Sequence, residues 1–256
     1  MLQPWQTGKI IRIENETNQT RRFWIELPAL TRFDFKPGQF VTLDLPIHEK
    51  PNKRWRSYSI ASWPDNSNVF ELVIVLLEGG AGTDYLFNHA SVGTELTLRG
   101  PQGVFVLPEK IETDLFFICT GTGIAPFRSM AHFMFEHQVP HKNIFLIFGC
   151  RKFTDCLYGH ELKDLSRRME GFHYHPVFSR EKNDDPAMPG VHTGYVHAVY
   201  EEIIKERRIK TGSEGQEEPV PAHFYLCGWK AMIDEAKQKI QSLGYERKLI
   251  HQELYG

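Results

Sequence analysis

The sequence has few cysteines, no motif for a metal centre and almost no net charge, and each of these absences excludes a class of protein. Four cysteines among 256 residues are too few and too scattered for a disulfide scaffold, paired CxxC zinc ligands or an iron–sulfur cluster. Thirty basic and 32 acidic side chains leave a formal charge of −2, so the broad positive field that favours nucleic acid is missing. We therefore expect neither a bound metal nor a nucleic-acid partner.

Long apolar runs are also absent. No stretch of 18 apolar residues occurs, and the first residues have no apolar core behind a basic segment. We expect a cytoplasmic protein without an export signal or a membrane span. Neither HExxH nor GxSxG occurs, which argues against zinc and serine hydrolases. Nothing in the sequence specifies an oligomeric state.

The first hundred residues contain short apolar runs separated by turn residues. Such spacing is typical of an antiparallel barrel or sandwich. A helix opened by a Thr83 cap is expected over residues 83–90. The predicted strands cover residues 8–14, 21–27, 39–45, 56–62, 69–78 and 94–100.

The pattern then changes to strand, glycine turn and helix, repeated four times. Near-continuous apolar strands alternating with helices predict a parallel sheet covered by helices. We therefore predict two domains, a β-barrel over residues 1–109 and an α/β domain over residues 110–256. A polar segment at residues 211–221 is expected to be a surface loop.

Two segments of the first domain have residues suited to a flavin nucleotide. In the run RSYS, Arg56 can bind a phosphate, Tyr58 offers a flat face to a ring, and the Ser59 hydroxyl can reach a ring nitrogen. The run GAGT, residues 80–83, provides bare backbone amides for a pyrophosphate. Taken singly, each segment is more often an ordinary strand or turn than a flavin site.

The second domain has features typical of a nucleotide site. The run GTGIAP, residues 121–126, follows an apolar strand and opens a helix, with proline where the Rossmann motif has its third glycine. Ser179 and Arg180 end another strand, where an arginine can bind a ribose 2′-phosphate or simply pair with Glu181. Cys227 ends the last long strand, as a ligand contact or only a small buried side chain.

The order RSYS, GGAGT, GTGIAPF, FGCR, SRE, CGW and a terminal ELY resembles that of the ferredoxin–NADP reductase family of flavoproteins. The resemblance covers nearly the whole chain. It implies an antiparallel β-barrel that binds FAD, followed by an α/β domain that binds NADP(H).

The resemblance also implies roles for the residues of these motifs. Arg56 binds the flavin phosphates, Tyr58 stacks on the isoalloxazine, and Ser59 lies near the nitrogen that accepts the hydride. Glu253 shapes the hydride contact and relays a proton. Tyr255 covers the flavin and yields to the nicotinamide. The remaining implied contacts are Gly80, Ala81, Gly82 and Thr83 for the FAD pyrophosphate, Gly121, Thr122, Gly123, Arg151, Ser179 and Arg180 for the nucleotide, and Cys227 and Gly228 for the nicotinamide.

This chain departs from the plant-type pattern in three places. The turn after residues 69–78 is short and leaves little to cover the FAD adenine. Ser179-Arg180 is not followed by the Lys-x-Tyr pair that also binds the 2′-phosphate, so Lys182 is the candidate to compensate and NAD(H) stays possible. One residue, Gly256, follows the terminal tyrosine.

The resemblance implies a reductase that transfers a hydride between NADP(H) and FAD, and single electrons between FAD and ferredoxin or flavodoxin. The basic side chains of Lys50, Lys53 and Arg54 either attract such an acidic carrier or form a solvated loop. Two alternatives stay open. The chain is a reductase for an oxygenase or a diaphorase that uses NADH, or it is an electron-relay subunit of a larger complex.

Overall fold

The computed structural model describes residues 3–181, 191–211 and 216–255, and the side chains of these residues except 210, 211, 216 and 217. The chain divides into two compact units. Unit 1 comprises Met1–Leu107 and Ala125–His137, and unit 2 comprises Pro108–Ile124 and Gln138–Gly256. Helix α2 (Ala125–Glu136) therefore clusters with unit 1. The domain boundary predicted after residue 109 stays a prediction.

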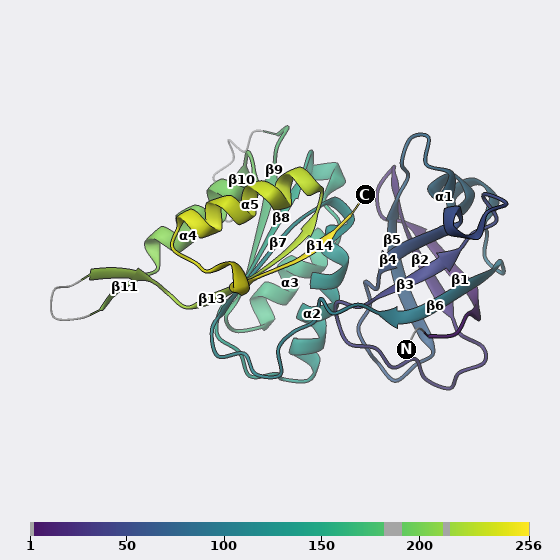
Figure 1. Cartoon of the computed structure of the whole chain (residues 1–256), viewed down its shortest axis with the longest axis horizontal. Helices are drawn as coiled ribbons and strands as arrows, with labels where there is room; N and C mark the ends of the chain where they lie inside the picture. Colours follow the sequence, from purple (N-terminus) through teal and green to yellow (C-terminus); the bar gives the residue numbers. More distant parts are fainter. Residues whose placement is uncertain (1–2, 182–190, 212–215, 256) are drawn as a thin grey trace. The chain divides into compact units, whose positions relative to one another are not determined.

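Unit 1 is a six-stranded antiparallel sheet in the order β4-β3-β6-β1-β2-β5, drawn in purple and blue in Figure 1. A bridge between Ile60 and Leu72 joins the two edge strands and closes the barrel. Leucine, isoleucine and phenylalanine side chains fill its interior. The predicted antiparallel barrel is confirmed. Its strands are β1 (Gln6–Asn15), β2 (Thr20–Glu26), β3 (Phe40–Asp44), β4 (Trp55–Ser59), β5 (Val69–Val75) and β6 (Glu95–Gln102).

The predicted helix of this unit is present, but it starts differently. Helix α1 (Ala81–Asp84) continues into a π-helical turn, η2 (Tyr85–His89), and its N-cap residue is Gly80. The predicted Thr83 cap is therefore wrong. The Thr83 hydroxyl accepts a hydrogen bond from the Leu77 amide at 3.1 Å and lies 3.0 Å from the Gly80 carbonyl, to which it donates. It closes the glycine loop instead of capping the helix.

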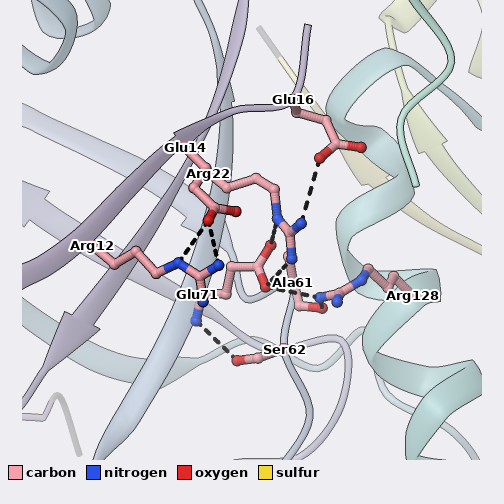
Figure 2. Close-up of polar contacts among 8 residues, drawn as sticks. All are labelled: Arg12, Glu14, Glu16, Arg22, Ala61, Ser62, Glu71 and Arg128. Carbon is pink, nitrogen blue, oxygen red and sulfur yellow. Dashed lines mark hydrogen bonds and ion pairs between the residues drawn. The ribbon is translucent and has the colours of Figure 1, made fainter. Parts of the chain in front are cut away.

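A buried carboxylate links two strands of the barrel to helix α2. Glu71 on β5 is 2% exposed and receives hydrogen bonds from Arg22 Nε at 2.6 Å and Arg128 Nη1 at 3.1 Å (Figure 2). Arg128, only 4% exposed on α2, also donates to the Ala61 carbonyl at 2.9 Å. The Glu71 amide donates to Ser62 Oγ at 2.9 Å, which fixes the strand beside its carboxylate. These contacts anchor α2 to the barrel.

We expect Glu71→Gln to lower the free energy of unfolding of unit 1 by about 3–5 kcal/mol, because it leaves a buried guanidinium without its counter-charge. The matched control is Glu14→Gln, whose carboxylate pairs with Arg12 at the surface (Figure 2). That change is expected to cost at most about 1 kcal/mol. Urea unfolding followed by tryptophan fluorescence measures both, and equal losses in the two variants would contradict the assignment.

Unit 2 is a parallel sheet in the order β10-β9-β8-β7-β13-β14. Helices α4 and α5 cover one face, where they pack on alternate strand residues such as Phe116, Ile118 and Phe224. Helix α3 lies on the opposite face (Figure 1). The predicted α/β fold is confirmed. Its elements are β7 (Asp114–Thr120), β8 (Ile144–Cys150), α3 (Gly159–Arg168), β9 (Phe172–Phe178), β10 (His192–Thr193), α4 (Val196–Glu206), β13 (Ala222–Gly228), α5 (Lys230–Ser242) and β14 (Ile250–Leu254).

Two features of unit 2 were not predicted. Strand β14 extends the sheet beside β13, with His251 opposite Tyr225 and Glu253 opposite Cys227. The polar segment predicted as a surface loop is partly a hairpin, β11 (Arg208–Thr211) with β12 (Gln216–Pro219). Among the described residues, no helix is both long and apolar enough to cross a membrane.

Histidine pairs join both edge strands of this sheet to their neighbours. The ring nitrogens of His175 and His192 lie 3.0 Å apart between β9 and β10, and those of His223 and His251 lie 3.0 Å apart between β13 and β14. Burial, followed by the neighbouring histidines, lowers the pKa of His175 to about 4. Burial also lowers the pKa of the other three. Each pair is therefore held with neutral rings.

We expect the stabilisation that comes from the neutral ring of His175 to be complete above pH 6.5 and to be lost as the pH falls toward 4. In that interval the histidine of the unfolded chain binds a proton that the folded His175 does not. Protonation therefore stabilises the unfolded state relative to the folded state. In His175→Gln, the loss between pH 7.5 and 4.5 is expected to shrink by on the order of 2 kcal/mol. His160→Gln, at an exposed site on α3, is the control. Identical pH profiles for both variants would refute this account.

Candidate cofactor and nucleotide sites

Strand β4 carries the predicted flavin residues of unit 1. Arg56 and Tyr58 lie on one face of the strand, because successive side chains alternate. Ser59 is 4% exposed. Burial raises the pKa of Tyr58 to about 12, against the opposing charge of Arg56. The Tyr58 phenol is therefore neutral at physiological pH, and its ring is an uncharged flat surface.

The structure brings Arg56 and the glycine loop together, although they lie far apart in sequence. A Cβ atom on Gly82 would be 2.9 Å from Arg56 Cγ and 3.1 Å from its Nε, so only glycine leaves room for this side chain. Arg56 Nη1 donates to the carbonyls of Lys53 at 3.1 Å and Trp55 at 2.8 Å. A fixed guanidinium thus lies beside the N-terminal amides of α1, which lack acceptors within the helix. This cradle fits the phosphates of FAD.

In unit 2, the predicted nucleotide turn lies at the point where the strand order reverses. Strand β7 pairs with β8 on one side and β13 on the other, and the carboxyl ends of strands at such a reversal are where open α/β sheets bind ligands. The turn η3 (Gly121–Ile124) follows β7 at this end. A Cβ atom on Gly123 would lie 2.5 Å from the Cys227 carbonyl oxygen. The bare backbone of Gly123 is therefore required for the turn to pack on β13.

A hydroxyl at the same place was missed in the sequence. Thr120 Oγ1 is buried and has no hydrogen-bond partner among the described residues. A Cβ atom on Gly228, where φ is +147°, would lie 2.5 Å from it. The signal was one polar residue, Thr120, directly after the apolar run of residues 115–119. A buried hydroxyl left without a partner fits a polar group of a bound nicotinamide nucleotide.

Cys227, Glu253 and Tyr255 meet at the end of β13. Cys227 pairs with Glu253 in the strand register, and the Tyr255 amide donates to the Gly228 carbonyl at 3.0 Å. Burial raises the pKa of the Cys227 thiol well above its usual value, with further contributions from the charges of Glu253 and Cys119. A hydrogen bond from the Tyr255 side chain opposes this shift. Cys227 therefore stays a neutral thiol, suited to van der Waals contact rather than to acid–base chemistry.

The predicted 2′-phosphate residues gather at the ends of β8 and β9. The Ser179 amide donates to the Cys150 carbonyl at 3.0 Å, and the Arg180 amide donates to the Arg151 carbonyl at 2.9 Å. Ser179 and both arginines are exposed. Two guanidinium groups on adjacent strand ends suit a dianionic phosphate. Lys182 and Gly256 lie outside the described residues.

The basic residues predicted to attract a carrier differ in their contacts. Lys50 and Lys53 are exposed around the turn η1 (Pro51–Lys53). Arg54 instead donates through Nε to Asp44 Oδ1 at 2.7 Å, on β3. Part of this positive charge is therefore neutralised within the barrel.

Comparisons with known proteins agree with the two units. Residues 7–107 match the model of an oxidoreductase FAD-binding domain. Residues 117–238 match that of an oxidoreductase NAD-binding domain.

Individual relatives point to one family. The chain is 34% identical over 224 residues to ferredoxin–NADP reductase B of Sorangium cellulosum, covering 87% of this chain and 86% of that protein. It is 28% identical over 258 residues to the glycine betaine monooxygenase reductase subunit of Pseudomonas aeruginosa, covering 99% of this chain but only 66% of that one.

A crystal structure of a ferredoxin NADP+ reductase from Neisseria gonorrhoeae with bound FAD and NADP superimposes with a TM-score of 0.76. The sequences are 25% identical, and 98% of each chain is covered. The chain therefore belongs to the ferredoxin–NADP reductase family of electron-transfer oxidoreductases, with FAD as cofactor and NAD(P)H as substrate.

Proposed function

We propose that this chain is a reductase that exchanges electrons between NADPH and a separate one-electron carrier protein, ferredoxin or flavodoxin, through FAD. The preference for NADPH rests on the cluster of Arg151, Ser179 and Arg180, whose charge and hydroxyl suit a ribose 2′-phosphate. The ferredoxin-type carrier rests on the 34% identity to ferredoxin–NADP reductase B.

In this proposal, unit 1 holds the flavin through groups that its fold already positions. Arg56 and the amides of residues 80–83 bind the FAD phosphates, with Gly82 leaving room for Arg56. Tyr58 offers its neutral ring to the isoalloxazine, and Ser59 offers a hydroxyl to its ring nitrogens. When bound, FAD supplies the conversion between two-electron hydride transfer and one-electron transfer.

Unit 2 binds the nucleotide and orients the nicotinamide. Thr120 Oγ1 supplies a polar contact at the end of β7, and the neutral Cys227 thiol supplies a close apolar one. Tyr255, whose amide donates to the Gly228 carbonyl, moves aside for the nicotinamide. Glu253 is the proposed proton relay at the edge of this contact. Orientation is the main requirement, since hydride transfer needs reacting atoms at about 3–3.5 Å.

A second candidate is the reductase component of an oxygenase system. The observation that favours it is the 28% identity over 99% of this chain to the glycine betaine monooxygenase reductase subunit. The motifs shared by both candidates bind FAD and nucleotide, so the acceptor separates them. Steady-state assays with ferredoxins, flavodoxins and oxygenase components under one set of conditions distinguish the two. A relay subunit is refuted if NADPH alone bleaches the bound flavin.

We expect Gly82→Ala to weaken FAD binding about tenfold, because the new methyl group displaces Arg56 from its place beside α1. Alanine favours a helix by up to about 1 kcal/mol, so the apoprotein is not expected to lose stability. Flavin release on dilution, followed by fluorescence, gives the affinity. Asn88→Ala, at an exposed position on η2, is the control for helix propensity. Equal FAD affinity in both variants would remove Arg56 from the phosphate site.

We expect NADPH to bleach the flavin at far lower concentration than NADH in an anaerobic titration. Arg180→Gln is expected to raise KM for NADPH about tenfold and to leave KM for NADH unchanged, because it removes one charge-assisted bond to the 2′-phosphate. Arg167→Gln, an exposed arginine on α3, controls for net charge. If Arg180→Gln changes KM for NADPH and KM for NADH equally, the 2′-phosphate site lies elsewhere.

A further inference from the structure

Two cysteine thiols lie against each other at the end of β8. Cys150 is the last residue of the strand, and Cys156 follows the short helical turn η4 (Phe153–Asp155). The two side chains are joined by a hydrogen bond, and each is partly exposed to solvent. The other two cysteines, Cys119 and Cys227, are buried, and none of the four forms a disulfide. Only this pair is therefore both in contact and accessible.

The surrounding loop holds both thiols in place. Cys156 Sγ lies 3.4 Å from the Tyr174 hydroxyl on β9. A Cβ atom on Gly159 would be only 2.9 Å from the same sulfur, so glycine leaves the space that this thiol occupies. Cys150 Sγ donates to the Lys152 carbonyl at 3.6 Å. The Lys152 amide in turn donates to Asp155 Oδ2 at 3.1 Å, which fixes the bend between the two cysteines.

This loop is connected to the proposed 2′-phosphate cluster both through the chain and through hydrogen bonds. Arg151 lies between the two cysteines in sequence, and its carbonyl accepts the Arg180 amide at 2.9 Å. The Cys150 carbonyl accepts two hydrogen bonds from Ser179, one from its amide at 3.0 Å and one from its hydroxyl at 3.3 Å. A displacement of Cys150 toward Cys156 therefore moves the backbone on which Arg151 and Ser179 are positioned.

We propose that Cys150 and Cys156 form a reversible redox site, in which a peroxide converts the two thiols to a disulfide and thereby weakens the binding of 2′-phosphorylated nucleotides. The effect on nucleotide binding rests on the proposed function, whereas the disulfide itself does not.

The chemistry balances with hydrogen peroxide as the oxidant. One cysteine sulfur attacks a peroxide oxygen, the O–O bond breaks, and a sulfenic acid and one water form. The second sulfur displaces the hydroxyl of the sulfenic acid as a second water, and the S–S bond forms. The two sulfurs lose two electrons, and the peroxide gains them. A dithiol reductant reverses the step by thiol–disulfide exchange.

The ionisation of the pair sets its rate of oxidation. The hydrogen bond with Cys156, followed by burial, raises the pKa of the Cys150 thiol. Because the thiolate is the reactive form, oxidation is expected to be slow at pH 7 and to accelerate as the pH rises.

The test compares protein treated with hydrogen peroxide and with dithiothreitol. Trypsin cuts after Arg151 and Lys152, so a disulfide joins two peptides that otherwise separate, residues 143–151 and 153–163. Mass spectrometry is expected to show these peptides joined only after peroxide. Oxidised protein is expected to bind 2′,5′-ADP about tenfold more weakly, with a matching rise in KM for NADPH when ferricyanide is the acceptor. Dithiothreitol restores both values.

Cys156→Ser is expected to keep the activity of the reduced wild type and to lose the response to peroxide, and Cys150→Ser provides a second test. Peroxide that leaves the two peptides unjoined overturns the proposal. A joined pair with unchanged 2′,5′-ADP affinity overturns its effect on the nucleotide site. If the reduced protein shows no NADPH-dependent reduction of ferricyanide, the proposed function fails. In that case the joined peptides and weakened 2′,5′-ADP binding still support the redox site.

Discussion

The buried carboxylate of Glu71 constrains the barrel and the helix packed on it. A buried charge is unfavourable unless counter-charges and hydrogen bonds surround it, and Glu71 is satisfied only when Arg22 and Arg128 are both in place. Arg128 comes from a helix that starts directly after the nucleotide turn η3. The same ion cluster lies beside the Ile60–Leu72 bridge that closes the barrel. One set of contacts therefore both closes the barrel and anchors α2. A hydrophobic substitute would lack this directional requirement, so the cluster favours one arrangement of the elements over others.

At its nucleotide turn, the second unit depends on close backbone contacts. At the reversal of strand order, the turn after β7 packs on the end of β13 so closely that Gly123 has no room for a Cβ atom. This packing places Thr120, Cys227 and Gly228 around one point, and β14 adds Glu253 and Tyr255 to it. The arrangement follows from the topology, because the connections after β7 and β13 lead to strands on opposite sides, β8 and β14, and ligands bind at such a reversal. Residues that are distant in sequence thus meet through the pairing of strands.

Local patterns in the sequence were enough to predict both folds and most of the candidate residues. Apolar spacing distinguished the barrel from the α/β unit, and glycine runs located the turns. The errors concern features that local patterns do not contain. Thr83 resembles a cap in sequence, but its hydroxyl bonds to Leu77 six residues earlier. Strand β14 is mostly polar, and it is recognisable as a strand only through its pairing with β13. The contact between Glu71 and Arg128 spans 57 residues, and nothing in either segment alone indicates its partner.

The nucleotide site of this protein is easier to infer from the sequence than its electron acceptor, because only the nucleotide site depends on local sequence patterns. Hydride transfer requires positioning to a fraction of an ångström, which ties it to glycines, buried hydroxyls and strand registers that leave a pattern in the sequence. Redox partners that exchange single electrons associate through small, transient interfaces. Such an interface needs only surface charge such as that of Lys50 and Lys53. Of the three basic side chains that the sequence suggested there, one, Arg54, is paired with Asp44. One scaffold can therefore keep its FAD and nucleotide sites while its surface changes partners, consistent with relatives that include both a ferredoxin–NADP reductase and an oxygenase reductase subunit.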